Sequence, residues 1–232
     1  MRLAFKAYKI VIFDSDGVIL NSNSIKLRSF MELAASVGSL EDAENIATII
    51  TNSKALTRYE IVAIIQNFST QNRDGNKSFY YDLLNRFSNL TYSSLLNCDL
   101  DAGIYMLKHQ SPRSQWFVLT AGDQQETESL YRERGIINLF SGGIYGAPIS
   151  KQTNLERILA VSKALDPDEI LMLGDSYSDA ELAFASKIDF ALINHWSHCS
   201  KAEDFCRQHS QSIFRDLVDV SEATSDGCQS LR

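Results

Sequence analysis

Residues 11–17 read Val-Ile-Phe-Asp-Ser-Asp-Gly, and this stretch decides the fold of the chain. Its first three residues are apolar, which is typical of a short buried strand, and two carboxylates and a glycine follow closely. The apolar run 116–119 leads in the same way into Thr-Ala-Gly at 120–122. A third apolar run, 170–173, leads into Gly-Asp-Ser-Tyr-Ser-Asp at 174–179. The chain therefore has three predicted strands that each end in a polar cluster.

These clusters are expected to meet in space. In an open parallel sheet, ligands bind beyond the carboxyl ends of the strands. If the three strands are neighbours, Asp14, Asp16 and Asp175 converge on one crevice, and Thr120 adds a hydroxyl. Such a crevice suits a divalent cation and a phosphoryl group.

The composition is that of a globular protein. Of the 232 residues, 44% are hydrophobic and 22% charged, which allows a sizeable core in one large domain or in a medium and a small one. The net charge of −7 argues against nucleic acid as the main partner, because phosphate backbones attract clustered Lys and Arg. No apolar run reaches the ~18–20 residues of a membrane span, and no signal peptide is expected. With no membrane span expected, we also expect no membrane partner. The four cysteines show no disulfide framework, so we expect a reduced, cytoplasmic protein.

The chain divides into a helical block and an alternating block. Residues 9–14 are expected to form the first strand. From Ser24 to about Leu90, apolar residues recur at spacings of three and four, with polar breaks at 37–39 and 71–76. This pattern predicts several helices and no strand.

After about residue 100 the pattern alternates. Helices are expected at 101–109, 123–134, 151–164 and 178–186, and strands at 115–120, 143–146, 169–174 and 189–194. Such alternation predicts βαβ units and a parallel α/β sheet, into which the helical block is inserted after the first strand. The tail from Ser221 is polar and is expected to fray.

Asp14 is the candidate nucleophile. A carboxylate can attack phosphorus and form an aspartyl-phosphate, which divides one difficult displacement into two easier steps. Repulsion between this carboxylate and a phosphate calls for a bridging cation, and Asp175 is placed to bind one. Asp16, one step further out in the same turn, can protonate the leaving alkoxide and later deprotonate water. Hard oxygen ligands favour Mg²⁺ over Zn²⁺ as the cofactor.

Other residues have candidate roles around the phosphate. Gly17 relieves the backbone where the chain turns beside a ligand. Thr120 offers a hydroxyl, and Ala121 a backbone N–H, to hold a phosphoryl oxygen. Lys151 begins a predicted helix, and its ammonium can offset the charge shared by Asp14 and the phosphate.

Each signal also has a plainer structural explanation. An isolated Asp-x-Asp is usually a turn or a cap, and a single Thr or Lys after a strand says even less. The 174–179 stretch also fits a helix N-cap, where Asp and Ser are favoured. The ordered set outweighs these explanations, because all four polar signals occur in one chain at workable spacings.

Taken together, the motifs resemble those of the haloacid dehalogenase-like hydrolase superfamily. The matching segments are Asp14-Ser15-Asp16-Gly17-Val18, Leu119-Thr120, Lys151 and 174–179, and the resemblance covers about residues 8–195. It implies an α/β core with a doubly wound parallel sheet, strand one central, and an α-helical cap inserted after the first motif. It places the core at 1–20 and 98–232 and the cap at 21–97, and it implies Mg²⁺ dependence.

The resemblance also assigns roles. Asp14 becomes the nucleophile and Asp16 the acid/base, while Asp14, Asp175 and the backbone carbonyl of Asp16 bind the metal. Thr120, Ala121 and Lys151 bind phosphate. The supporting residues are Gly17, Gly174, Ser176 and Asp179, the last serving the metal site or Lys151.

The branch of the family follows from Asp16. Dehalogenases lack this second aspartate, so its presence favours phosphate esters. The helical cap is similar to that of phosphoglycolate phosphatase and β-phosphoglucomutase relatives. The expected substrate is a small phosphorylated metabolite, such as a sugar phosphate, a sugar-acid phosphate or a phosphoglycolate-like acid. The alternatives are a phosphosugar mutase and a catalytically idle binding or regulatory protein.

Two further groups of residues are candidate binding sites, one in the predicted cap and one after the last predicted strand. Arg58, which opens a predicted cap helix, and Lys54 are candidates for gripping a second anionic group of the substrate, although a solvated surface Arg is the plainer interpretation. His195, His198, Cys199, Cys206 and His209 crowd into a short stretch, but their spacing matches no zinc pattern, so a strand end followed by a helix is expected there. The sequence names neither the substrate nor the oligomeric state.

Overall fold

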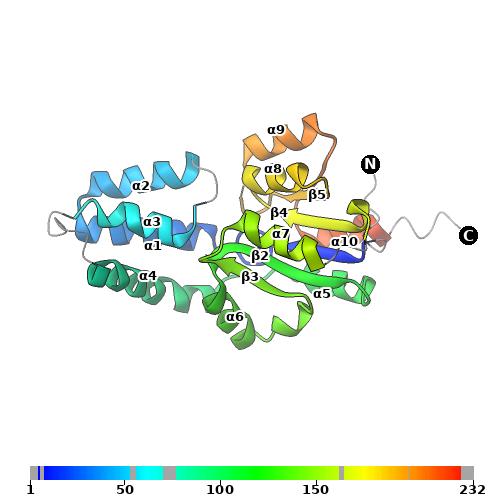
Figure 1. The fold of residues 1–232 in the computed structure, drawn as a ribbon, viewed down its shortest axis with the longest axis horizontal. Coiled ribbons are helices and arrows are strands. Elements are labelled where there is room, and N and C mark those ends of the chain that lie inside the picture. Colours follow the sequence, from blue (N-terminus) through cyan, green and yellow to red (C-terminus); the bar gives the residue numbers. More distant parts are fainter. Residues whose placement is uncertain are drawn as a thin grey trace, which may run out of the picture.

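The computed structural model describes most of the chain. The described residues are Phe5, 8–52, 56–69, 77–161, 165–197 and 199–225. Figure 1 shows two regions, a group of helices at the left and a sheet flanked by helices at the right.

A six-stranded parallel sheet forms the core, in the order β3-β2-β1-β4-β5-β6. The strands are β1 (Ile10–Phe13), β2 (Gln115–Asp123), β3 (Gly143–Ala147), β4 (Ile170–Gly174), β5 (Asp189–Ile193) and β6 (Ser212–Phe214). All four residues of β1 are buried, as expected for a strand covered on both faces. Because β1 lies between β2 and β4, the three strands that end in polar clusters are adjacent, as the sequence predicts.

Helices cover both faces of the sheet, which makes it doubly wound. One face packs against α5 (Gly103–Gln110), α6 (Gln124–Glu133) and α10 (Leu217–Ser225). The other packs against α7 (Lys151–Val161), α8 (Tyr177–Ala185) and α9 (Ser200–Gln208). Alternate residues of β1 belong to the two clusters, Val11 and Phe13 to the first and Ile10 and Ile12 to the second. The α/β fold class predicted from the motifs is confirmed.

Four helices lie between β1 and α5. They are α1 (Asn23–Val37), α2 (Leu40–Asn52), α3 (Arg58–Gln66) and α4 (Lys77–Asn97). These helices form a hydrophobic cluster of their own, in which the rings of Phe30 and Phe87 stack with centroids 3.9 Å apart. The last turn of α4 does not belong to this cluster, because its Leu95 packs into the core beside the sheet. We call α1–α4 the helical insertion (Figure 1).

The C-terminal part differs from the sequence prediction. The tail from Ser221 is expected to fray, but Leu217–Ser225 form α10, and Ser221 is buried. Residues 226–232 of that tail lie outside the described residues. Leu217 and Val220 are fully buried in the core, and the Gln110 side chain donates hydrogen bonds to the Ser221 carbonyl and hydroxyl. Contact with α5 therefore stabilises a segment whose own polarity favours a coil.

Two more elements depart from the expected bounds. Strand β2 runs to Asp123, three residues beyond its predicted end at Thr120, with a register shift against β3 between Leu119 and Asp123. The short strand β6 was not predicted; it extends the sheet beside β5.

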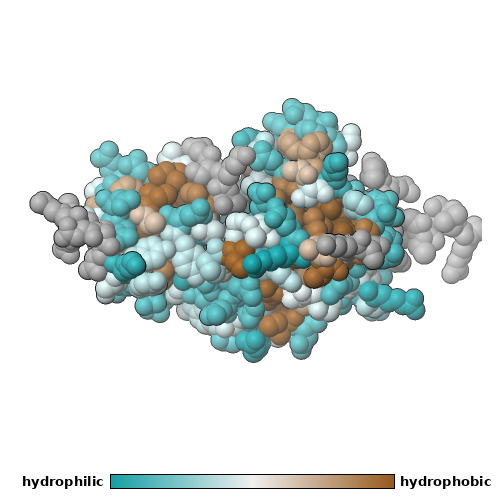
Figure 2. Space-filling model, in the orientation of Figure 1, coloured by the Kyte–Doolittle hydropathy of each residue, from teal (hydrophilic) through white to brown (hydrophobic). Residues whose placement is uncertain are grey.

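The surface is mixed. Figure 2 shows apolar residues of this face in several separate patches among hydrophilic ones. No helix in the described part of the chain combines the length and the apolar character that crossing a bilayer requires.

Candidate active site

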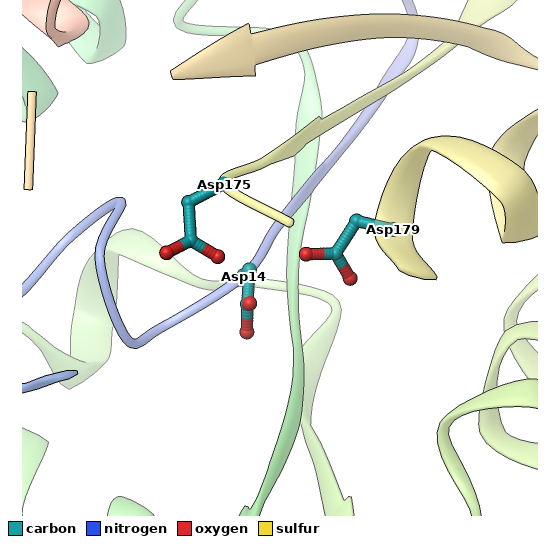
Figure 3. Close-up of side chains that lie close together, drawn as sticks. All are labelled: Asp14, Asp175 and Asp179. Carbon is teal, nitrogen blue, oxygen red and sulfur yellow. The ribbon is translucent and has the colours of Figure 1, made fainter. Parts of the chain in front are cut away.

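Three buried carboxylates meet at the carboxyl ends of β1 and β4. Asp14 follows β1, Asp175 follows β4, and Asp179 lies in the first turn of α8. One oxygen from each lies within 4.8 Å of the others, and Figure 3 shows the three side chains pointing toward one another. Burial raises the pKa of Asp175 to about 7, and the neighbouring Asp179 adds to the rise. Burial also raises the pKa of Asp14 well above its usual value, although Lys151 opposes the rise.

Lys151 provides the positive charge beside these acids. Its Nζ lies 2.9 Å from Asp14 Oδ2 and 2.6 Å from Asp179 Oδ1. Burial alone would lower the pKa of Lys151, but the attraction of Asp14 and Asp179 raises it above its usual value, so the ammonium stays charged. Lys151 is the first residue of α7, and the buried Asn154 one turn later donates to the carbonyls of Gly146 and Ile149. Asn154 thereby holds the loop from which the lysine emerges.

Asp16 is held by two residues at the start of the helical insertion. Ser22 Oγ donates to its Oδ1 at 2.5 Å, and Lys26 Nζ to its Oδ2 at 2.6 Å. Burial would raise the pKa of Asp16, but the Lys26 charge and the hydrogen bonds from Lys26 and Ser22 outweigh it and hold the pKa below its usual value. The carboxylate form of Asp16 is therefore favoured.

The turn after β1 comes very close to Asp175. Gly17 has a φ of +77°, and a Cβ there would lie 2.0 Å from Asp175 Oδ2. Asn23 Nδ2 donates to the same Asp175 oxygen at 2.7 Å. Only glycine allows this conformation together with this close approach.

The end of β2 forms another side of the crevice. Thr120 is buried, and its Oγ1 accepts a hydrogen bond from the Gly122 backbone N–H at 2.9 Å. Ala121 and Gly122 line the cavity described below. The Lys26 Nζ lies 3.3 Å from where a Gly122 Cβ would be, so a lysine of the insertion reaches over this strand end.

The 174–179 stretch forms the predicted helix cap and also contacts Lys151. Ser176 caps α8, and Ser176 and Asp179 form a capping box. The other carboxylate oxygen of Asp179 faces Lys151. Gly174 has no room for a side chain, because a Cβ would lie 2.5 Å from the Asp179 Cβ. Asp179 therefore belongs both to the cap of α8 and to the charged contact with Lys151.

A cavity of about 810 Å³ opens from the carboxylates toward the helical insertion. Asp14, Asp16, Lys151 and Asp175 lie in its wall. On the insertion side, apolar and polar residues both line it. The apolar ones are Leu27, Phe30, Ile50, Leu56, Ile61, Phe87 and Leu95.

Arg58 lies in the cavity wall, but its charge is already matched. Its Nη1 is hydrogen-bonded to Glu126 of α6, and its Nη2 donates to Ser88 Oγ at 2.8 Å. Next to it, the Tyr59 hydroxyl donates to Asp123 at 2.5 Å. Arg58 thus joins the insertion to the core, a contact that the sequence interpretation missed. Lys54, the other candidate of this loop, falls outside the described residues.

The described residues of the cysteine and histidine cluster lie in different surroundings. The His209 ring stacks on Phe205 with centroids 4.1 Å apart, and Cys206 is buried in the core. Cys199 lies at the edge of the cavity, and His198 is outside the described residues. Burial raises the pKa of the Cys206 thiol to about 11, which keeps it protonated and unreactive.

A divalent cation fits the carboxylate group on two observations. Three carboxylates face a single ammonium, Lys151, so the cluster carries excess negative charge. Both oxygens of Asp179 are engaged, by Lys151 and Ser176, and those of Asp14 contact Lys151 and the Ser15 N–H. Asp175 uses one oxygen in the hydrogen bond from Asn23, so its other oxygen is the best placed to hold a cation. All available donors are oxygens, as Mg²⁺ prefers.

The comparison with protein families agrees with this site. The profile of the haloacid dehalogenase-like hydrolase family matches residues 11–193. This match spans most of the chain, and the chain belongs to that family. The class that fold and family define is a haloacid dehalogenase-like hydrolase, and Asp14 and Asp16 both lie in the crevice.

Solved structures share the fold. A protein named as a phosphoglycolate phosphatase from Haemophilus somnus has a TM-score of 0.67 and 17% identity, covering 94% of this chain and 98% of its own. Another so named, from Lactobacillus plantarum, has a TM-score of 0.65 and 20% identity, covering 93% and 99%. CbbY from Rhodobacter sphaeroides, solved with phosphate, has a TM-score of 0.64 and 14% identity, covering 92% and 96%. No curated protein sequence matches this chain significantly.

The sequence interpretation gave no role to Ser22, Asn23 and Lys26. All three contact site carboxylates, and Asn23 and Lys26 lie one turn apart in α1. Their spacing of three residues places them on one helix face directly after the first motif. That spacing is the signal that would have found them.

Proposed function

We propose that this protein is a Mg²⁺-dependent phosphatase that hydrolyses a small phosphorylated metabolite through an aspartyl-phosphate. The observation that carries the proposal is the contact of Asp14 with Lys151, beside Asp175 and below an open cavity. In this position the Asp14 carboxylate can meet a ligand that enters the cavity, while the Lys151 ammonium offsets its negative charge.

The reaction has two displacements. In the first, an Asp14 carboxylate oxygen forms a bond to phosphorus, the bond from phosphorus to the ester oxygen breaks, and the released alkoxide takes a proton. In the second, water attacks the phosphorus of the aspartyl-phosphate, loses a proton, and releases Asp14 and inorganic phosphate. Asp16 is proposed to give the first proton and accept the second.

Lys26 affects this proton transfer through its contact with Asp16. By holding the pKa of Asp16 low, it favours the carboxylate, which is the form that accepts a proton from water. Donation to the alkoxide requires the protonated form. We propose that substrate binding weakens the contact between Lys26 and Asp16, since a phosphoryl group at Ala121 and Gly122 also attracts the ammonium.

Asp14, Asp175 and the backbone carbonyl of Asp16 would hold Mg²⁺. Bound there, the cation supplies charge neutralisation between the nucleophile and the phosphate. Lys151 would neutralise a phosphoryl oxygen on the other side, and Thr120 and the Ala121 N–H would orient it. Asp179 would keep Lys151 in place, as its contact of 2.6 Å supports.

We propose residues 21–97 as the cap and 1–20 with 98–232 as the catalytic core. The separate hydrophobic cluster of α1–α4 supports this division. The contacts of Arg58 with Glu126 and of Tyr59 with Asp123 would hold cap and core together over a bound ligand. Three cysteines in the described part of the chain are free, which supports a reducing, cytoplasmic setting.

The test is turnover of a panel of phosphate esters with Mg²⁺, using Asp14→Asn as the inactive control. We expect release of inorganic phosphate that Asp14→Asn abolishes. Recovery of an isomeric phosphosugar from a hexose 1-phosphate would identify a mutase instead. Absence of turnover on the whole panel, with Mg²⁺ still bound, would indicate a binding or regulatory protein.

A further inference from the structure

The helical insertion contributes a group of apolar side chains to the cavity wall. Leu27 and Phe30 of α1, Ile61 of α3 and Phe87 of α4 line it together with further apolar residues. Phe30 and Phe87 are the stacked pair of the insertion, and both are nearly fully buried by protein. The space that remains, about 810 Å³, is far more than a two-carbon phosphate would occupy.

Beside Ser24, three residues of the insertion place hydroxyl groups in the cavity wall, and these three already donate hydrogen bonds within the protein. Thr51 Oγ1 donates to the Ala47 carbonyl, and Thr91 Oγ1 to the Phe87 carbonyl. The Tyr92 hydroxyl donates to Glu133 at 2.5 Å. The protons of these three hydroxyls are therefore engaged within the protein, and a ligand meets them as acceptors only.

The cations of the wall are committed as well. Among the described residues of the insertion, Lys26 and Arg58 are the basic side chains that line the cavity. Lys26 pairs with Asp16, and Arg58 pairs with Glu126. The Arg58 Nε is buried without a partner in the described structure, which leaves one donor for one acceptor atom of a ligand.

We propose that the natural substrate carries its phosphate on an apolar body, alkyl or aromatic, with few hydroxyls. A polyhydroxyl chain in this wall would lose more hydrogen bonds to water than it gains from the few partners there, which costs free energy, whereas an apolar body gains from every carbon it buries. This inference rests on the proposed function, because it concerns the leaving group of the same reaction.

A series of n-alkyl phosphates tests the proposal on the whole protein with Mg²⁺. From ethyl to butyl to hexyl phosphate, kcat/KM is expected to rise about fourfold for each added methylene. Phenyl phosphate distinguishes an aromatic preference, and glucose 6-phosphate and phosphoglycolate serve as polar references. A flat or falling alkyl series, or a preference for glucose 6-phosphate over hexyl phosphate, would overturn the proposal.

A pair of variants tests whether this wall of the cavity causes the dependence of kcat/KM on alkyl length. Leu27 is half-buried in the cavity wall, whereas Leu40 of α2 is 78% exposed and does not line the cavity. Leu27→Gln is expected to lower kcat/KM about tenfold for hexyl phosphate and little for ethyl phosphate. Leu40→Gln is expected to change neither. Equal effects of Leu27→Gln on both esters would contradict the assignment of this wall to the substrate body.

Binding of alkylphosphonates separates this inference from the proposed function. Ethyl-, butyl- and hexylphosphonate are not hydrolysed, and their affinity for the Mg²⁺-loaded protein can be measured by calorimetry. If affinity rises along the series while no ester is turned over, the apolar subsite stands and the phosphatase proposal fails. If esters are turned over but affinity does not rise, the apolar subsite fails alone.

Discussion

The buried carboxylates should make the metal-free protein less stable as pH rises. Asp175 has a pKa of about 7 in the folded protein, against 3.8 for an ordinary aspartate. Its folded pKa is raised, so the unfolded chain releases this proton at lower pH than the folded chain does. Stability is therefore lost as pH rises from about 4 through about 7.

The size of the effect follows from this difference. Since one pKa unit corresponds to about 1.4 kcal/mol, Asp175 alone should cost about 3 kcal/mol of unfolding free energy between pH 5 and pH 8. In a chain of this length that lowers the melting temperature by about 6–12 °C. Asp14, whose pKa is also raised by burial, acts in the same direction. Lys151 stays charged across this range and adds no dependence.

The assay is thermal unfolding of chelator-treated protein at pH 5, 6, 7 and 8. Asp175→Asn should remove about 3 kcal/mol of the pH dependence and melt above the wild type at pH 8. Asp82→Asn, an exposed residue of α4, is the matched control and should behave as the wild type. Mg²⁺ should raise the melting temperature of the wild type most at pH 8. An identical pH slope in Asp175→Asn and the wild type would refute this account.

Three further outcomes are expected. Asp14→Asn should abolish turnover in a cleanly folded protein, because an amide does not attack phosphorus; residual turnover within tenfold of wild type would contradict the covalent mechanism. Lys26→Met should raise the pKa of Asp16, so the acidic limb of the pH–kcat profile should move to higher pH; an unmoved limb would show that Lys26 does not control it. Arg58→Ala and Glu126→Ala should each lower the unfolding free energy. The double variant should lose about 1 kcal/mol less than the sum of the two single losses, within the range for partly exposed ion pairs. Strictly additive losses in unfolding experiments would contradict the contact between insertion and core.

The sequence prediction was most complete where the signal is local. The strand that ends at Asp14 is recognisable because a strand buried on both faces needs a continuous apolar run, and the polar cluster begins where burial ends. The same reasoning places the ends of β2 and β4. Their adjacency to β1 is only a condition in the sequence argument, and the order of the strands meets that condition.

Prediction failed where a residue's environment comes from a distant segment. Residues 221–225 are polar by themselves and are helical because Leu217 and Val220 of the same helix pack into the core. Strand β6 is three residues long and gains its partners only from β5. Neither has a periodicity long enough to be recognised alone.

The sequence by itself determined the fold class, the family and the candidate acids, because these depend on short apolar runs and on residues within a few positions of each strand end. Only the tertiary structure decided what those residues contact. The partners of Arg58 in α4 and α6 lie 30 and 68 residues away, and the partner of Asn23 lies 152 residues away. Such pairings depend on how the helical insertion packs over the sheet, and no local pattern encodes them.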